Sequence, residues 1–303
     1  MAEQISQTGA SGVRSEASQK TMRLGDARGL GYAEYGDPAG KPIFYFHGWP
    51  SSRLEAWNYH AAGSRLGARI IGVDRPGIGL SSYKRGYKIS DWPDDVAALA
   101  DSLGIERFGV VGISSGAPYS YARARFIQER LTGAAVVSGV GPLDIPEPGK
   151  YVLKDELRAI WVARRTPWLA RILFGYLFSR MARNPEKSMA KMIEHMPESD
   201  REILTKPDRD DGFSEALKEM GRHGMRGAVQ TIALEGRPWG FTLEEVRMKV
   251  HVFHGEADSL AFPETARYVS GRLPNCQLHL YPGDGHIATV INRADDVIKT
   301  LLA

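Results

Sequence analysis

The sequence predicts an α/β protein in which helices flank a mainly parallel sheet and one helical segment is inserted between two strands. Three observations support this fold class. Strand-length apolar runs alternate with longer amphipathic stretches over residues 22–139. Residues 140–240 show a helical pattern and no convincing strand, and the alternation then returns over residues 241–303. Strands that alternate with helices favour right-handed crossovers, which place successive strands parallel.

The composition is that of an ordinary globular protein and narrows the classes of function. The chain has 303 residues with 39 Lys and Arg against 36 Asp and Glu, so its charge of +3 does not favour nucleic acid as a partner. Its single cysteine, Cys276, allows neither an intrachain disulfide nor a cysteine-based metal centre. No apolar stretch approaches the about 20 residues of a membrane span, and the amino terminus lacks a secretory signal. These features lead us to expect a cytoplasmic protein.

The expected core begins after a tail. Residues 1–21 are predicted to be a disordered tail, because this stretch is rich in Ser, Gln, Ala and Gly and lacks periodicity. The apolar runs that follow have the length and β-branched content of buried strands. Strands are therefore expected at Leu30–Tyr35, Ile43–Phe46, Arg69–Val73, Phe108–Val111, Ala134–Ser138, Lys249–Phe253 and Gln277–Tyr281.

Helices are predicted where amphipathic stretches carry start and stop signals. In the helix expected to begin at Ser52, Ser52 and Glu55 have capping-box spacing. Gly67 and Gly104 stand directly after the first two predicted helices, as helix stop signals do. The predicted helices are Ser52–Leu66, Asp91–Leu103, Ser115–Arg130 and Ala288–Leu302.

The pentapeptide Gly112-Ile113-Ser114-Ser115-Gly116 matches G-x-S-x-G and stands where a predicted strand gives way to a predicted helix. A nucleophile on such a sharp turn has a strained backbone and stands above the sheet edge, while the glycines let strand and helix approach closely. The pattern predicts a nucleophilic serine at Ser114. The alternative is a plain strand–helix connection in which Ser114 caps the helix.

Four motifs in order make the chain resemble the α/β-hydrolase fold superfamily, in its serine-nucleophile, lid-bearing, esterase-like branch. They are His47-Gly48-Trp49-Pro50, Asp74-Arg75-Pro76-Gly77-Ile78-Gly79-Leu80-Ser81, the Ser114 pentapeptide, and the pair His254-Gly255-Glu256-Ala257-Asp258 and Gly283-Asp284-Gly285-His286. The resemblance covers residues 22–303 and is loose only over 140–240. It implies the α/β-hydrolase fold and no metal or organic cofactor. Haloalkane dehalogenases and epoxide hydrolases of this fold use an aspartate where this chain has Ser114.

The resemblance implies a catalytic triad in the chain order Ser, Asp, His. His286, after the last strand, is the expected general base for Ser114, and Asp258 is the carboxylate expected to orient its ring. The competing carboxylates are Glu256, Asp284 and the more distant Asp144.

The resemblance also implies an oxyanion hole formed by the backbone N–H groups of Trp49 and Ser115. Ser115 stands at a helix amino terminus, where the dipole favours negative charge. The substrate pocket is expected to include Trp49, His47, Ile113 and Ile287, and the main expected role of His47 is to brace its loop.

Residues 140–240 correspond to the helical cap, or lid, of this family, which shapes the pocket and excludes water. The segment is rich in apolar and aromatic side chains, so a small to medium hydrophobic substrate is expected. Between Arg158 and Lys191 it also carries eight Lys and Arg against one Glu. A solvated cationic face explains this charge; a membrane-surface helix and a dimer contact are the alternatives.

Together the motifs predict a serine hydrolase that cleaves a carboxylic ester or lactone through an acyl-enzyme. A carbon–carbon bond hydrolase or cofactor-free oxygenase on the same triad is one alternative. A small-molecule receptor that uses the hydrolase-fold pocket is the other. The expected partner is a small hydrophobic substrate and no nucleic acid. Membrane contact is left open but is not favoured, and the protein is expected to be a monomer or homodimer.

Overall fold

The computed structural model describes residues 19–145, 147–183, 193–206 and 212–303. Most of the expected tail, residues 1–18, lies outside this range. The tail prediction is wrong at its end, because β1 (Lys20–Arg23) is already a strand. It pairs antiparallel with β2 (Gly29–Gly36), placing Lys20 opposite Tyr32. A four-residue strand at a sheet edge is too short to show a period in the sequence.

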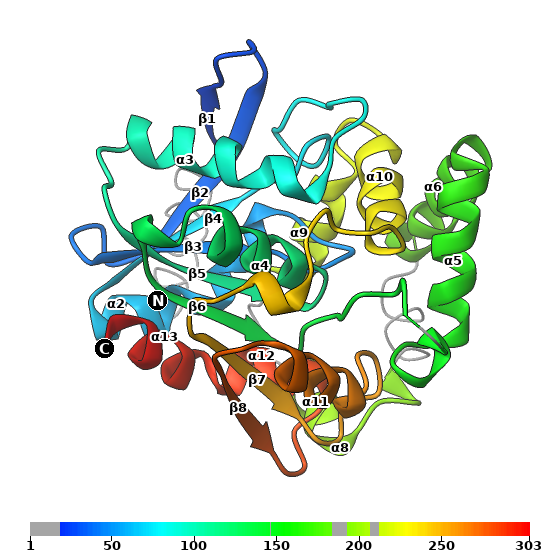
Figure 1. Ribbon diagram of the computed structural model, residues 1–303. Helices are drawn as coiled ribbons and strands as arrows, with labels where there is room; N and C mark the ends of the chain where they lie inside the picture. The colour runs from blue at the N-terminus through cyan, green and yellow to red at the C-terminus, as the bar shows by residue number, and fades with distance from the viewer. Residues whose placement is uncertain (1–18, 146, 184–192, 207–211) are drawn as a thin grey trace, which may run out of the picture.

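An eight-stranded sheet forms the centre of the molecule, in the order β1-β2-β4-β3-β5-β6-β7-β8 (Figure 1). The two pairs that involve β2 are antiparallel, and all other neighbouring pairs are parallel. The seven predicted strands are confirmed. Beyond β2 they are β3 (Lys41–Phe46), β4 (Ala68–Val73), β5 (Phe108–Ile113), β6 (Leu131–Val137), β7 (Val250–Gly255) and β8 (Cys276–Tyr281). Because β3 to β8 run parallel, the loops that follow them meet at one edge of the sheet.

Helices cover both faces of the sheet. One face packs against α3 (Trp92–Ser102), α4 (Ala117–Phe126) and α11 (Pro263–Arg272). The other face packs against the 3₁₀ helix η1 (Arg53–Tyr59), α2 (His60–Leu66) and α13 (Ala294–Leu302), with part of α12 (His286–Asn292). Both faces of the parallel strands are therefore buried, as their continuous apolar sequences require.

Three predicted helices are each divided in the structure. In the predicted Ser115–Arg130 helix, α4 ends at Phe126 and a separate 3₁₀ turn covers Gln128–Arg130. The predicted Ser52–Leu66 helix is η1 followed by α2, and the predicted carboxy-terminal helix is α12 followed by α13, with a break at Arg293. The Arg293 side chain is held by Asp284, at 2.7 Å. Such breaks preserve the apolar period on both sides, so a pattern of amphipathic spacing does not reveal them.

The helical segment between β6 and β7 forms its own small core beside the sheet. Its described helices are α5 (Lys154–Arg165), α6 (Pro167–Arg183), α8 (Glu198–Leu204), α9 (Phe213–Met220) and α10 (Arg226–Glu235). Phe174 and Phe178 of α6 and Ile232 of α10 pack together with Ile78 of the sheet domain. Among the described residues, no helix combines the length and apolar character needed to cross a bilayer.

A backbone contact joins this segment to the sheet domain at Gly227, in the first turn of α10. A Cβ atom at Gly227 would lie 2.0 Å from the carbonyl oxygen of Gly77. We expect Gly227→Ala to destabilise the fold by about 1–3 kcal/mol, because the added methyl group forces two backbone segments apart. Urea unfolding measures the change.

The matched control is Gly271→Ala in α11, where a Cβ atom meets nothing within 4 Å. This variant should be neutral or up to about 1 kcal/mol more stable, because alanine favours a helix. Equal effects of the two substitutions would contradict the close contact at Gly227.

Candidate active site

Ser114 lies on a sharp turn between the buried strand β5 and α4. Its φ is 51°, in the left-handed region that non-glycine residues rarely adopt. A single 3₁₀ turn, Ser114–Gly116, connects the strand to α4. The predicted helix therefore begins at Ala117, two residues later than expected. The strained backbone holds the Ser114 side chain above the end of the strand, as a nucleophile on this kind of turn requires.

Glycines on either side of Ser114 allow the turn to close. A Cβ atom at Gly112 would lie 2.4 Å from the carbonyl oxygen of Gly116, and one at Gly116 would lie 2.1 Å from the carbonyl oxygen of Phe46. Both distances are far below any real van der Waals contact. The spacing of the pentapeptide thus reflects two backbone approaches, one within the turn and one to β3.

His286 and Asp258 form a buried hydrogen-bonded pair. His286 is the first residue of α12, and its Nδ1 lies 2.8 Å from Oδ2 of Asp258. The other carboxylate oxygen of Asp258 accepts the backbone N–H groups of Leu260 and Ala261, each at 2.9 Å. Because the carboxylate is anchored on both oxygens, it fixes the ring orientation of His286 and leaves Nε2 as the free ring nitrogen.

The competing carboxylates are engaged elsewhere. Glu256 binds Arg267 at 2.8 Å on the surface, and Asp284 binds Arg293. Asp144 is exposed. Of the four candidates, only Asp258 contacts the ring of His286.

The pair shifts the pKa of each partner. Burial by itself would lower the pKa of His286, but the charge and hydrogen bond of Asp258 outweigh it, with Asp200 and Glu156 adding, so the pKa is raised. Burial would raise the pKa of Asp258, but the charge and hydrogen bond of His286 hold it below its usual value. The geometry therefore stabilises an imidazolium at His286 beside an ionised Asp258.

The buried guanidinium of Arg75 arranges the loop after β3. It donates to the carbonyl oxygens of His47 and Gly48, both at 2.6 Å, and to that of Ser115 at 3.4 Å. Because C=O and N–H point in opposite directions across a trans peptide, holding the Gly48 carbonyl directs the N–H of Trp49 away from Arg75.

The same argument applies to the peptide that follows Ser114. The Ser114 carbonyl oxygen accepts the N–H of Val140 at 3.2 Å, so the N–H of Ser115 points away from Val140. The N–H groups of Trp49 and Ser115 are thus each oriented by the hydrogen bond that the carbonyl oxygen of the same peptide accepts. Such preoriented donors can stabilise a developing oxyanion.

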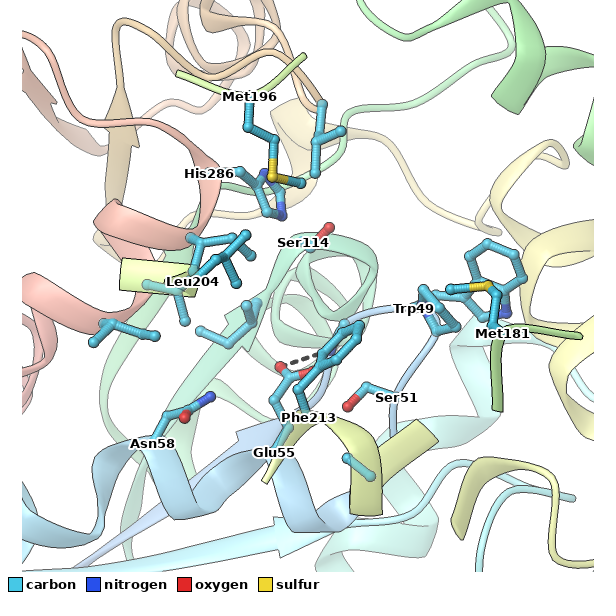
Figure 2. A pocket seen from close by; sticks show the side chains of 18 residues that line it. Trp49, Ser51, Glu55, Asn58, Ser114, Met181, Met196, Leu204, Phe213 and His286 are labelled. Carbon is cyan, nitrogen blue, oxygen red and sulfur yellow. Dashed lines mark hydrogen bonds between the residues drawn. The ribbon is translucent and has the colours of Figure 1, made fainter. Parts of the chain in front are cut away.

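A cavity of about 190 Å³ contains Ser114 and His286 in its lining. The Ser114 hydroxyl and the His286 ring point toward one another across it (Figure 2). Trp49, Ile113 and Ile287 also line it, as the pocket prediction has it. The inserted segment contributes Met181, Met196, Leu204, Phe213 and Ala216. The lining is therefore largely apolar around a few polar groups, the usual character of a small-molecule site.

His47 is not part of this lining, so its place in the predicted pocket is wrong. It is fully buried behind the loop, with Nδ1 2.8 Å from the Gly48 carbonyl oxygen and 3.1 Å from the Arg75 guanidinium. Burial and the charge of Arg75 hold its pKa well below the usual value. A neutral His47 therefore braces the loop, as the other part of the prediction states.

Glu55 is a cavity residue that the sequence reasoning assigned to a helix cap. Ser52 does cap η1, but the Glu55 carboxylate accepts the N–H of Gly48 and the hydroxyl of Tyr45, both at 3.0 Å. It lies at the cavity wall with Asn58 (Figure 2). Burial raises its pKa. The capping-box spacing therefore identifies Ser52 correctly as the cap, but the Glu55 side chain binds the amide of Gly48 instead of completing the box.

Asp200 of α8 holds the loop that carries His286. Its two oxygens accept the N–H groups of His286, at 3.0 Å, and Ala288, at 2.8 Å. The neighbouring Ser199 hydroxyl accepts the N–H of Gly285 at 2.9 Å. Three backbone N–H groups at the start of α12, which have no partner within the helix, are thus bound by side chains of the inserted segment. A carboxylate at the amino terminus of a helix also interacts favourably with the helix dipole. No sequence pattern pairs these distant residues.

Two further carboxyls of the inserted segment lie near the pair. Burial raises the pKa of Glu156, on α5, to about 7, with His286 opposing and Asp258 adding to the rise. Burial raises the pKa of Glu235, on α10, to about 8; Glu156 adds to the rise, and the Ser115 hydroxyl opposes it. Both carboxyls therefore hold their protons more tightly than an exposed glutamate does.

The histidines of β7 do not form a metal pair. His251 contacts His279 of β8 at 3.2 Å, while His254 is buried and contacts the carbonyl oxygen of Ala261 at 2.7 Å. Within the described residues no group of three His, Cys, Asp or Glu side chains is arranged to hold a metal ion.

Comparison with known proteins agrees with this geometry. The family model described as "Alpha/beta hydrolase family" matches residues 43–300. The chain belongs to the alpha/beta hydrolase family. The match includes the Ser114 turn, Asp258 and His286.

Relatives of this alpha/beta hydrolase carry several activities. It is 25% identical to a bifunctional esterase/perhydrolase from Acinetobacter calcoaceticus over 90% of this chain and 94% of that one. It is 23% identical to a 2-hydroxy-6-oxo-2,4-heptadienoate hydrolase from Pseudomonas putida, over 82% and 83%. A thermophilic esterase from Thermogutta terrifontis has the same fold, with a TM-score of 0.65 and 20% identity over 94% of this chain and 98% of that one.

The electrostatic coupling within this hydrolase can be measured directly. We expect Asp258→Asn to lower the pKa of His286, because the charge and hydrogen bond that raise it are weakened while burial remains. NMR titration of the His286 ring checks this. Glu256→Gln, which neutralises the exposed carboxylate two residues earlier, is the control and should leave the titration unchanged. An unchanged titration in Asp258→Asn would contradict the pairing.

Proposed function

We propose that this protein is a serine hydrolase that cleaves carboxylic esters of small hydrophobic substrates through an acyl-enzyme. One observation carries the proposal: Ser114 and His286 face each other in one apolar cavity, and the buried Asp258 binds the far side of the His286 ring. The esterase activity of the Acinetobacter relative supports the same chemistry. The N–H groups of Trp49 and Ser115 form the proposed oxyanion hole.

In the proposed mechanism Ser114 Oγ attacks the ester carbonyl carbon while Nε2 of His286 takes its proton. The carbonyl oxygen becomes an oxyanion held by the two backbone N–H groups. When the tetrahedral intermediate collapses, the bond to the leaving alcohol breaks, and His286 gives its proton to that oxygen. Water then loses a proton to His286 and attacks the acyl-enzyme. The acid is released, and Ser114 recovers its proton.

The inserted segment acts as a cap in this proposal. Its side chains supply much of the apolar cavity wall, and Asp200 holds the amides that begin α12. A cavity of about 190 Å³ is smaller than the roughly 300–1,000 Å³ of drug-sized ligand sites, which favours short acyl groups.

A second candidate is hydrolysis of a carbon–carbon bond beside a carbonyl group. The Pseudomonas relative, named for such a substrate, aligns over 82% of this chain. The same triad serves both reactions, so the two are separated by turnover of simple esters, which a carbon–carbon bond hydrolase hydrolyses poorly.

Hydrolysis of p-nitrophenyl esters from acetate to decanoate tests the ester proposal. Wild type should turn over the short esters fastest, because the cavity is small. Ser114→Ala should lower kcat by roughly 10⁴-fold or more, because the nucleophile is lost. The control is Ser270→Ala, at a partly exposed serine on α11 that lies outside the cavity lining, which should keep full activity.

The outcomes divide the hypotheses. If wild type hydrolyses no ester but a fluorophosphonate still labels Ser114, then Ser114 is a nucleophile and the ester proposal is rejected. Neither turnover nor labelling would favour the receptor alternative.

The pH profile should respond to Glu156. Its charge helps to raise the pKa of His286, which must be neutral to accept a proton from Ser114. In Glu156→Gln the pKa of His286 falls, so the acid limb of kcat/KM should move to lower pH. Asp155→Asn, on the adjacent exposed residue, is the matched control. An acid limb at the same pH in all three proteins would contradict a role for Glu156.

A further inference from the structure

Exposed apolar side chains gather on one part of the molecule. In the described residues eight large apolar side chains are exposed, and seven of them lie between residues 153 and 177. We call these seven the α5–α6 face: Leu153, Trp161, Trp168, Ile172, Leu173, Tyr176 and Leu177. The eighth is Phe126, on α4. Single exposed apolar residues are normal on a protein, but a group of this size marks an interaction surface.

Helix α6 is apolar on two opposite sides. Phe174 and Phe178 are buried in the core of the inserted segment. Ile172 and Tyr176, one turn apart on the other side, are 62% and 67% exposed. In Figure 1, α5 and α6 stand at the margin of the molecule, away from the sheet. A helix that is apolar all round is normally covered on all sides, so its outer side lacks a partner within the described residues.

The same helices are strongly basic. Residues 153–183 contain seven Lys and Arg against two acidic residues. One of the acidic pair, Asp155, binds Arg158, and the other, Glu156, is half-buried on the side toward His286. The outer surface of this segment therefore combines Trp, Tyr and aliphatic side chains with uncompensated positive charge.

A second cavity, of about 310 Å³, opens beside the first turn of α6. Four arginines line it and no acidic residue does; we call it the arginine cavity. They are Arg164, Arg171, Arg226 and Arg237. The Arg226 guanidinium stacks over the Tyr83 ring at 3.8 Å. None of the four forms an ion pair with a described residue, whereas Arg28, Arg53 and Arg293 all do. Guanidinium groups without an ion-pair partner that line one cavity suit a phosphate.

We propose that the α5–α6 face docks on the surface of an anionic phospholipid bilayer and that the arginine cavity receives a headgroup phosphate. Trp and Tyr side chains with flanking arginines are the composition of segments that lie in the membrane interface. The arginine cavity adjoins the α5–α6 face. Pro167 and Arg171 line the cavity, and the residues next to them in the chain, Trp168 and Ile172, belong to the face.

Charge distinguishes this occupant from a second copy of the chain. A two-fold dimer through the α5–α6 face would bring two identical basic surfaces together, and like charges at an interface oppose association. An anionic bilayer offers the opposite charge, and each arginine near such a surface adds attraction.

The docking surface is the outer side of a helix that also closes the Ser114 cavity. On the inner side of α6, the rings of Phe174 and Phe178 pack against Trp49, with centroids 5.6 and 6.0 Å away. Met181, on the same helix, lines the cavity. A docked bilayer would therefore lie directly outside one wall of the candidate active site.

Cosedimentation of the full chain with vesicles tests the proposal. Wild type should bind vesicles of phosphatidylcholine and phosphatidylglycerol at 3:1 and bind pure phosphatidylcholine weakly, with binding that falls as salt rises. The double variant Arg164→Gln, Arg171→Gln should lower the partition coefficient roughly tenfold or more. The double variant Trp168→Ser, Tyr176→Ser should lower it by a similar factor, because the inserted apolar area is lost.

The matched control removes two positive charges elsewhere. Arg247→Gln, Lys249→Gln neutralises exposed residues at the amino end of β7, the opposite edge of the sheet from the inserted segment, and should bind vesicles as wild type does. Circular dichroism and thermal unfolding establish that every variant is folded.

Three results would overturn the proposal. The first is that wild type binds both vesicle types equally, or that the partition coefficient falls as much in the control variant as in the test variants. The second is a dimer in sedimentation velocity that disappears in Trp168→Ser, Tyr176→Ser, which would assign the face to a second copy. The third is that wild type binds inorganic pyrophosphate but does not bind vesicles. This result would assign the arginine cavity to a soluble phosphate compound.

Discussion

The buried guanidinium of Arg75 is the interaction on which the arrangement around Ser114 depends. It binds backbone carbonyls from two loops that follow different strands, the loop after β3 and the turn after β5. Within the described residues it has no carboxylate at ion-pair distance, so its charge is stabilised by peptide dipoles and by the face of Tyr119 at 5.1 Å. A hydrogen bond to a charged group contributes about 1.5–3 kcal/mol, and a lost one leaves a buried charge uncompensated. The loops are therefore held together by hydrogen bonds from one buried charged group.

A second constraint joins the inserted segment to the edge of the sheet where Ser114 and His286 lie. Asp200 and Ser199 accept the amides that begin α12, and His286 is the first residue of that helix. A Cβ atom at Gly285 would lie 2.4 Å from the Asp200 carboxylate, so the loop and α8 approach without space for a side chain. The segment thus does more than cover a pocket: its carboxylates orient the His286 loop from outside and raise the pKa of the ring. Its outer side, basic and aromatic, faces away from this site.

Much of the fold follows from the sequence because its signals are local. Apolar runs of strand length specify seven of the eight sheet strands. The glycine spacing around Ser114 reflects close backbone approaches that any strand–turn–helix of this kind requires. The roles expected of Ser114, Asp258 and His286 came from the resemblance to a known family. They fit the predicted fold, because each residue follows a predicted strand and parallel strands present their carboxyl ends at one edge. The strand β1 escaped prediction because it is too short to show a period, and the breaks within three predicted helices escaped because an amphipathic pattern does not reveal them.

The fold class, the turn that carries Ser114 and the candidate residues of the site follow from patterns in the sequence. The partners of individual polar side chains are known only from the folded chain. Asp258 rather than Glu256 or Asp284 meets His286, Glu55 holds the Gly48 amide rather than a helix cap, and His47 lies behind its loop rather than in the cavity. The physical reason is that a carboxylate's role depends on which donors surround it, and those donors come from segments far apart in the chain, among them Asp200 and its partners 86 and 88 residues away.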